Sequence, residues 1–168
     1  MTYAVVYSSR TGNTKKLAEA IYGRLGPQEC VYMGPPDGKA LEAERIFAGF
    51  WTDKGSCDGE SARFLEGLGG REVFLFGTAG FGGDPGYFER ILLQVKKKLP
   101  SDARAAGCYM CQGRMPIQVR QRYEAMEGQP GAPENLAGMI ENFDRALSHP
   151  DPLDVEGLLK RIEEVWGL

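Results

Sequence analysis

The chain has no apolar run of about 18 residues, so no membrane-spanning helix is expected. Its net charge is only −3, which excludes both the basic footprint of a nucleic-acid-binding domain and a strongly acidic surface. The N-terminus begins on a strand-like segment and lacks the charged and apolar regions of a signal peptide. We therefore expect a cytoplasmic protein that binds neither membranes nor nucleic acid.

Cysteine and histidine are scarce, which argues against disulfide frameworks and metal sites. The four cysteines (Cys30, Cys57, Cys108 and Cys111) show no disulfide-framework spacing, and we expect them to stay reduced. Cys108 and Cys111 form a C-x-x-C pair, but residues three apart on a strand point to opposite faces, which opposes a dithiol. His149 is the only histidine, so no metal site is predicted, and we expect it to be a surface loop residue.

Several motifs of nucleotide and phosphate chemistry are also missing. There is no P-loop, and the turn after the first predicted strand has no G-x-G-x-x-G fingerprint. Response regulators need acidic residues at the end of that strand, where this chain has Ser8-Ser9-Arg10. Cys108 to Arg114 does have the C-x5-R spacing of cysteine phosphatases, but Met115-Pro116 follows where such loops place Ser or Thr and a helix. A phosphatase therefore stays a minor alternative.

The chain alternates short apolar runs with helical periodicities, a pattern typical of a parallel α/β sheet. A length of 168 residues favours one domain, residues 1–168, with a sizeable core. The predicted strands are residues 3–7, 30–33, 46–51, 73–76 and 105–110. Helices are predicted over residues 13–25, briefly around 64–68, and on apolar stripes at 88–99, 136–147 and 155–166. Residues 52–59 are expected to form a polar loop.

The most informative segment is the loop between the first strand and the first helix. Its sequence is Ser8-Ser9-Arg10-Thr11-Gly12-Asn13-Thr14, and it lies at the carboxyl edge of the sheet, where ligands bind in such folds. Small residues let backbone amides turn toward an anion, and the following helix adds its positive end. Because the loop contains no lysine, it suits one phosphate monoester better than a triphosphate with magnesium.

This loop resembles the FMN-phosphate loop of flavodoxins at Ser9, Thr11, Gly12, Asn13 and Thr14. The resemblance covers essentially the whole chain. It implies a flavodoxin-like three-layer α/β sandwich with a five-stranded parallel sheet in the order 2-1-3-4-5. It also implies FMN as a non-covalent cofactor, with Arg10 among the residues of the phosphate loop.

The resemblance places the flavin ring between the loops after the third and fourth strands. Trp51 ends the third strand, where it either stacks on the ring or completes the core, and Thr52 and Gly55 follow. Gly55 would supply the peptide that such proteins rearrange on reduction. The fourth strand leads into Thr78, Ala79 and Gly80, whose amides would face the flavin or its phosphate. Phe81 would form a ring wall, and Tyr87 is either a wall or a packing residue. Whether Cys57 or Cys111 lies near the flavin is left open.

Residues 113–134 form a long segment with Arg114, Arg120 and Arg122 and no regular periodicity. These arginines either dock an acidic partner or substrate carboxylates, or they sit in a solvated loop with scattered salt bridges. The strings Cys111-Gln112-Gly113-Arg114-Met115-Pro116 and Phe50-Trp51-Thr52-Asp53-Lys54-Gly55 resemble a narrower flavodoxin-like group associated with bilirubin reductase.

The resemblance implies an electron carrier that delivers electrons from FMN to a partner reductase, with a bilirubin-type reductase as one candidate partner. No residue would then act as a catalytic acid or base. One alternative is a small FMN-dependent NAD(P)H oxidoreductase. The other is a binding module of the same fold that holds no flavin. The weak net charge departs from the strongly acidic flavodoxins, argues against a generic partner and indicates either a dedicated complex or a different function.

Overall fold

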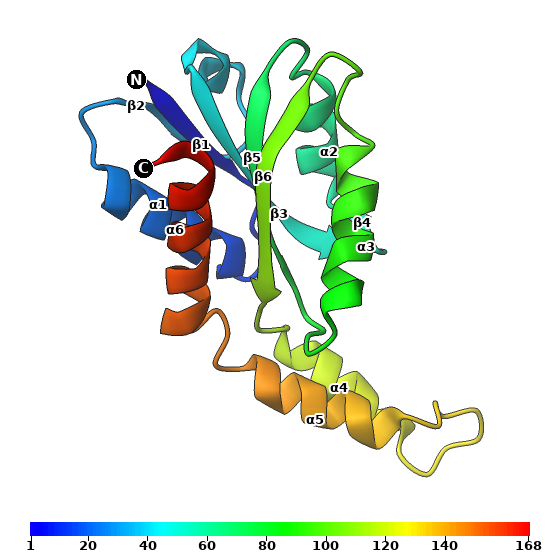
Figure 1. Ribbon diagram of the computed structural model, residues 1–168. Coiled ribbons are helices and arrows are strands. Elements are labelled where there is room, and N and C mark those ends of the chain that lie inside the picture. The colour runs from blue at the N-terminus through cyan, green and yellow to red at the C-terminus, as the bar shows by residue number, and fades with distance from the viewer.

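The computed structural model describes residues 1–168 and shows a parallel sheet between two helical layers (Figure 1). Its strands are β1 (Tyr3–Tyr7), β2 (Cys30–Gly34), β3 (Arg45–Asp53), β4 (Ser56–Cys57), β5 (Glu72–Ala79) and β6 (Arg104–Gln112). The parallel strands follow the order β2-β1-β3-β5-β6, and β4 pairs antiparallel with the end of β3. Leaving out β4, this is the order 2-1-3-4-5, so the predicted fold is confirmed.

Two pairs of helices cover the two faces of the sheet (Figure 1). On one face lie α1 (Asn13–Leu25) and α6 (Pro152–Trp166), and on the other lie α2 (Gly59–Glu66) and α3 (Pro85–Lys96). A 3-10 helix, η1 (Gly38–Glu42), connects β2 to β3. None of the helices combines the length and the apolar character needed to cross a bilayer.

Two further helices leave the layered body at the carboxyl ends of the strands (Figure 1). They are α4 (Ile117–Met126) and α5 (Leu136–Ala146), which we call the α4–α5 arm. The arm has a small core of its own, made by Tyr123, Leu136 and Phe143. It therefore packs largely against itself and not against the sheet.

The structure corrects the prediction of an irregular segment over residues 113–134, because α4 lies within it. Only Tyr123 of this helix is buried, so its apolar residues show no regular stripe that sequence reasoning could detect. Arg120 is not free to dock a partner, since its Nε lies 2.9 Å from Asp144 Oδ1 on α5 and it also pairs with Glu124. The glutamates of residues 113–134 equal the arginines in number, so this segment carries no excess of positive charge.

The predicted polar loop over residues 52–59 is also wrong. β3 continues to Asp53, and a tight turn returns the chain as β4. Lys54 and Gly55 have φ values of 49° and 78°, the two positive values that a type I′ hairpin turn requires. Such turns favour Asn-Gly or Asp-Gly, so the Lys-Gly pair gave a weak signal. β5 likewise extends to Ala79, so Thr78 and Ala79 lie on the strand and not in the following loop.

Polar caps set the starts of α2 and α3. Asp84 accepts a hydrogen bond from Gly86 N at 2.9 Å and Pro85 follows it, which confirms the predicted start of α3. Asp58 caps α2 by accepting from Ser61 N at 3.2 Å. These caps fix where the chain leaves the carboxyl edge of the sheet and turns back along it.

The sheet separates two cores, and the C-x-x-C pair is divided between them. Cys108 packs against the core beneath α2 and α3, whereas Cys111 belongs to the core beneath α1 and α6. Both are free thiols, as are Cys30 and Cys57. The prediction that the pair points to opposite faces of a strand is therefore confirmed.

Two glycine–phenylalanine pairs bring β3 and β5 together at the centre of the sheet. Gly49 lies opposite Phe76, and Phe50 lies opposite Gly77. A Cβ atom at Gly77 would lie 2.3 Å from the ring of Phe50, and one at Gly49 would lie 2.4 Å from the ring of Phe76. Each ring thus packs over the glycine of the neighbouring strand, directly before the strands reach their carboxyl ends.

This packing predicts that Gly77→Ala is destabilising. The buried Phe50 ring has no room to move away, so we expect the free energy of unfolding to fall by about 1–3 kcal/mol, the usual cost of overpacking. Gly138→Ala is the matched control, because Gly138 lies within α5 with nothing within 4 Å of the added Cβ. That change should be neutral or stabilising by up to about 1 kcal/mol. Urea denaturation followed by circular dichroism measures both, and equal stabilities for the two variants would contradict the packing argument.

Candidate functional site

The loops at the carboxyl edge of the sheet enclose a cleft of about 360 Å³. This volume falls in the range of small-molecule sites, roughly 300–1,000 Å³. The loop after β1 contributes Arg10, Thr11 and Asn13, and the end of β3 with its hairpin contributes Trp51, Thr52, Lys54 and Gly55. The end of β5 and the loop to α3 contribute Thr78, Ala79, Gly80, Phe81 and Tyr87. The segment after β6 completes the lining with Gly113, Arg114, Met115, Pro116 and Val119.

The structure thus brings the three predicted loops together around one cleft. All the predicted site residues line it except Ser9, Gly12 and Thr14. Sequence reasoning missed Lys54 and the whole segment after β6. The rule that parallel strands end at one edge applies to β6 as well, so the same argument could have identified Gly113 and its neighbours.

Two of the three predicted site residues that do not line the cleft, Thr14 and Ser9, hold the segments that form it. Thr14 is buried; its hydroxyl donates to Phe50 O at 3.1 Å and lies 3.2 Å from Thr78 Oγ1. Thr52 Oγ1 in turn donates to Thr78 O at 2.8 Å. Ser9 Oγ accepts from the N–H of Lys15 at 3.2 Å, in the first turn of α1. These side chains join the loops of β1, β3 and β5 to one another.

The loop after β1 presents backbone donors that the protein does not use. The N–H groups of Arg10, Thr11 and Gly12 have no acceptor within the protein. Asn13 and Thr14 open α1, and the first N–H groups of a helix have no partner within the helix. Gly12 has a φ of 86°, a left-handed conformation that favours glycine. This donor set, at a helix N-terminus, fits a phosphate monoester.

Asn13 links this loop to the segment after β6. Its Nδ2 donates to Arg114 O and to Thr11 Oγ1, each at 2.8 Å. A Cβ atom at Gly113 would lie 2.5 Å from the Asn13 amide, so only glycine leaves room for this contact. The Asn13 side chain is thus used for positioning, and the backbone amides around it remain available.

Aromatic side chains stand at the open side of the cleft. Phe81 is 40% exposed, and its ring lies edge-on to Tyr87 at 6.5 Å between centroids. Burial raises the pKa of the Tyr87 phenol, so it stays neutral over the physiological range. The guanidinium of Arg10 lies 5.5 Å from the centre of the Trp51 ring, a cation–π contact. The Phe81 ring is thus available to pack against a ligand in the cleft.

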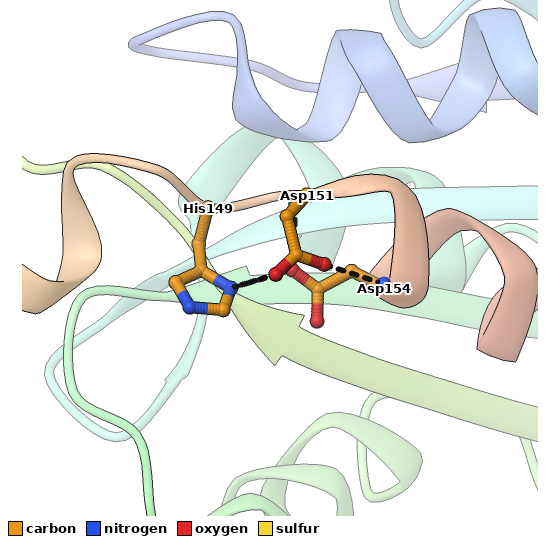
Figure 2. Close-up of side chains that lie close together, drawn as sticks. All are labelled: His149, Asp151 and Asp154. Atoms are coloured by element: carbon orange, nitrogen blue, oxygen red, sulfur yellow. Dashed lines mark hydrogen bonds and ion pairs between the residues drawn. The ribbon is translucent and has the colours of Figure 1, made fainter.

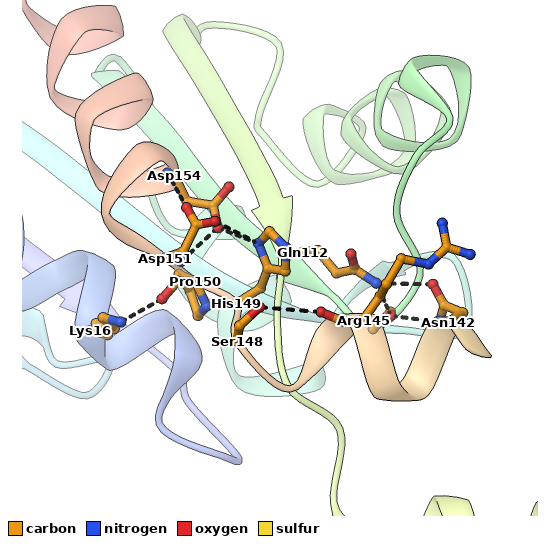
Figure 3. A network of polar contacts seen from close by, with 10 residues as sticks. Lys16, Gln112, Asn142, Arg145, Ser148, His149, Pro150, Asp151 and Asp154 are labelled. Carbon is orange, nitrogen blue, oxygen red and sulfur yellow. Dashed lines mark hydrogen bonds and ion pairs between the residues drawn. The ribbon is translucent and has the colours of Figure 1, made fainter. Parts of the chain in front are cut away.

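The α4–α5 arm holds one of the cleft loops in place. Gly80 O accepts hydrogen bonds from Gln112 Nε2 and from Asn142 Nδ2, each at 3.0 Å. Gln112 Nε2 also donates to Asn142 Oδ1 at 2.9 Å, so β6 and α5 meet at this carbonyl (Figure 3). Met115 packs directly on Gly80, since a Cβ atom there would lie 2.6 Å from its side chain.

A second polar cluster anchors the chain between α5 and α6. His149 Nδ1 lies 2.6 Å from Asp154 Oδ2, and Asp151 is beside them (Figure 2). Asp151 and Asp154 each accept the other's backbone N–H, at 2.9 and 2.8 Å, and so form a capping box at the start of α6. The hydrogen bond from Asp154 N is the main cause of the lowered pKa of the Asp151 carboxyl.

His149 does lie in the loop between α5 and α6, as expected, but it is half-buried and bonded and not a free surface residue. Lys16 Nζ donates to Pro150 O at 2.5 Å, and Arg114 N donates to His149 O at 3.1 Å, so α1 and the segment after β6 both hold it (Figure 3). The three side chains could in principle face one cation, but both carboxylates already accept backbone hydrogen bonds. The cluster therefore serves to position the return from the arm.

Neither Cys57 nor Cys111 lines the cleft. Both are buried, and burial raises the pKa of each thiol. The phosphatase alternative needs Cys108 as its nucleophile, but Cys108 packs against the core beneath α2 and α3 and does not line the cleft, which argues against it.

Comparison with known proteins identifies the family. The family model described as "Flavodoxin domain" matches residues 4–163. The chain belongs to the flavodoxin family. Two similar proteins are both named "Flavodoxin-like domain-containing protein BilS". The one from Clostridium symbiosum (strain WAL-14163) is 41% identical over 92% of this chain and 90% of its own length. The one from Clostridioides difficile (strain CD3) is 30% identical over the same shares.

Solved structures support the flavodoxin fold. A flavodoxin, WrbA-like protein from Agrobacterium tumefaciens has a TM-score of 0.51 at 13% identity, over 95% of this chain and 98% of that one. A flavoprotein in complex with FMN from Lactobacillus acidophilus NCFM has a TM-score of 0.50 at 15% identity, over 65% of this chain and 92% of that one. At these identities the likeness concerns the fold alone.

The hydrogen bonds of the threonines predict separate roles for Thr14 and Thr11. Thr14→Val removes a buried hydroxyl and leaves Phe50 O without its side-chain donor, so we expect the free energy of unfolding to fall by about 1–2 kcal/mol. Thr11→Val, the same change at a partly exposed position, should stay within about 0.5 kcal/mol of the wild type. Urea denaturation measures both. A Thr11 variant as unstable as the Thr14 variant would contradict the assignment of Thr14 as the buried link.

Proposed function

We propose that this protein binds FMN non-covalently in the cleft and delivers electrons from it to a partner reductase. The observation that carries the proposal is the row of unused backbone N–H groups at residues 10–12, which opens onto a cleft with aromatic side chains. Membership of the flavodoxin family supports the same conclusion. So does the FMN complex of the Lactobacillus flavoprotein, which shares the fold.

In this proposal the loop after β1 holds the phosphate. The amides of Arg10, Thr11 and Gly12 donate to its oxygens, and the N-terminus of α1 adds a favourable dipole. Thr11 Oγ1 lies at the edge of the cleft, where it donates to Arg114 O at 3.3 Å and accepts from Asn13 Nδ2 at 2.8 Å. Ser9 and Thr14 contribute through the backbone and by holding the loop, since their side chains bond within the protein.

The ring would lie among the ends of β3 and β5 and the segment after β6. Trp51 and Phe81 would wall its faces, and the backbone from Thr78 to Gly80 would face its polar edge. FMN supplies a ring that accepts and gives up one or two electrons. The side chains exclude water from most of the ring, and the exposed Phe81 marks the side from which a partner approaches.

The composition of the cleft favours a carrier over an oxidoreductase with its own substrate. Its lining contains no carboxylate, histidine or thiol, so no side chain there is suited to moving a proton near neutral pH. An electron carrier needs no such group. Because the sequence resembles the group associated with bilirubin reductase, a bilirubin-type reductase is the first partner to test.

Titration of the apoprotein with FMN tests the cofactor and its site. We expect tight binding with quenched flavin fluorescence in the wild type. Thr11→Glu places a carboxylate beside the phosphate, and we expect it to weaken binding by roughly two orders of magnitude or more, as like charges a few ångströms apart do. Ser101→Glu is the control, since this exposed residue precedes β6 at the opposite end of the sheet. A folded wild type that binds no FMN would favour the alternative of a binding module without flavin.

Steady-state kinetics separate the carrier from the stand-alone oxidoreductase. We expect the FMN-loaded protein alone to oxidise NADH or NADPH slowly, and the rate to rise when a separate flavin reductase supplies electrons. The measurement is the loss of absorbance at the nicotinamide band with and without that reductase. Rapid oxidation by the purified protein alone would favour the oxidoreductase.

A further inference from the structure

The charged side chains that line the cleft are all of one sign. Arg10, Lys54 and Arg114 line it, and no aspartate or glutamate does. All three are exposed, and none forms an ion pair within the protein. Arg120 on the nearby arm is different, because Asp144 neutralises it. The cleft therefore has a positive potential that the small negative net charge of the chain does not predict.

Contacts in three separate loops place these charges around the cleft. The Arg10 guanidinium rests over the Trp51 ring, 5.5 Å from its centre. Arg114 is held on both sides of its backbone, with its N–H on His149 O at 3.1 Å and its carbonyl on Asn13 Nδ2 at 2.8 Å. Lys54 stands in the hairpin turn between β3 and β4. A ligand in the cleft would thus lie near cationic side chains from the segments that follow β1, β3 and β6.

We propose that these three cations make the protein bind FMN more tightly when its ring is reduced than when it is oxidised. This inference rests on the proposed function. When a reductant such as dithionite donates two electrons and the ring takes up one proton, the ring gains one negative charge. The phosphate is unchanged between the two states, so its contacts cancel in the ratio of the two dissociation constants. The charge on the ring does not cancel, and the cleft offers it cations and no opposing carboxylate.

The affinity ratio has a direct consequence for the potential. Tighter binding of the reduced form raises the two-electron midpoint potential of bound FMN above that of free FMN. For a two-electron couple a tenfold ratio corresponds to about 30 mV. The protein would then take up electrons readily and donate them to an acceptor of moderate potential, not to one of very low potential.

Charge-neutralising variants of the holoprotein test the proposal. The site variant combines Arg10→Gln, Lys54→Gln and Arg114→Gln. The control combines Lys96→Gln, Lys97→Gln and Lys98→Gln, which removes the same charge at the end of α3, away from the carboxyl edge of the sheet. The dissociation constant of oxidised FMN comes from fluorescence quenching. The midpoint potential comes from dithionite titration with a reference dye, and the two together give the constant for reduced FMN.

We expect the wild-type potential to lie above that of free FMN in the same buffer. In the site variant the affinity ratio should fall by about tenfold, or about 30 mV, while the control should match the wild type. Because the three cations are exposed, the difference should shrink as salt rises from about 20 mM to 500 mM, where the screening length falls to a few ångströms. If the site variant does not fold or does not bind FMN, Arg10→Gln and Lys54→Gln are measured separately, and each should lower the ratio.

The outcomes separate this inference from the proposed function. A folded wild type that binds no oxidised FMN overturns both. Tight binding of oxidised FMN with a ratio that neutralisation leaves unchanged, in the triple variant or in both single variants, overturns only the inference. An equal fall of the ratio in the control also overturns it, because the effect would then come from net charge and not from the cleft.

Discussion

The arrangement of the cleft depends on buried hydrogen bonds where β1, β3 and β5 end. The hydroxyl of Thr14 bonds to the carbonyl of Phe50 and contacts the hydroxyl of Thr78, and Thr52 bonds to the carbonyl of Thr78. Buried polar groups are costly when unpaired, so these contacts hold each loop in the one position that satisfies the others. The glycine–phenylalanine pairs just before them let β3 and β5 pack closely enough for the contacts to form. The ligand-facing amides are positioned as a result.

The α4–α5 arm extends this arrangement beyond the layered body of the fold. Its own small core lets it stand apart from the sheet, and Asn142 reaches back to the carbonyl of Gly80. The cluster of His149, Asp151 and Asp154 fixes the return of the chain into α6. The backbone of Arg114, in the segment between β6 and α4, is held by Asn13 through its carbonyl and by His149 through its N–H. The segment that leads from β6 into the arm therefore brings to the cleft a wall and a charge that the five-stranded body lacks.

Charge shows how far the sequence and the site can differ. The chain as a whole is slightly acidic, yet the cleft is lined by Arg10, Lys54 and Arg114 without a carboxylate. Composition counts residues irrespective of place, whereas the potential felt by a ligand depends on which charges lie near it and which are paired. The arginines of residues 113–134 illustrate the point, since Arg120 is neutralised within the arm and Arg114 faces the cleft.

Local patterns in the sequence determined the fold and most of the lining. The strand and helix periodicities, the Asp84-Pro85 start of α3 and the loop from Ser9 to Thr14 depend on neighbouring residues, so they could be interpreted without the structure. The hairpin at Lys54-Gly55 is local, but its residue pair gave only a weak signal. The helix within residues 113–134 and the contacts of Thr14 and His149 could not be interpreted, because they depend on residues far apart in the chain, such as Thr14 with Thr78 or Lys16 with Pro150. Only the tertiary structure brings such partners within hydrogen-bonding distance and decides which side chains face the cleft.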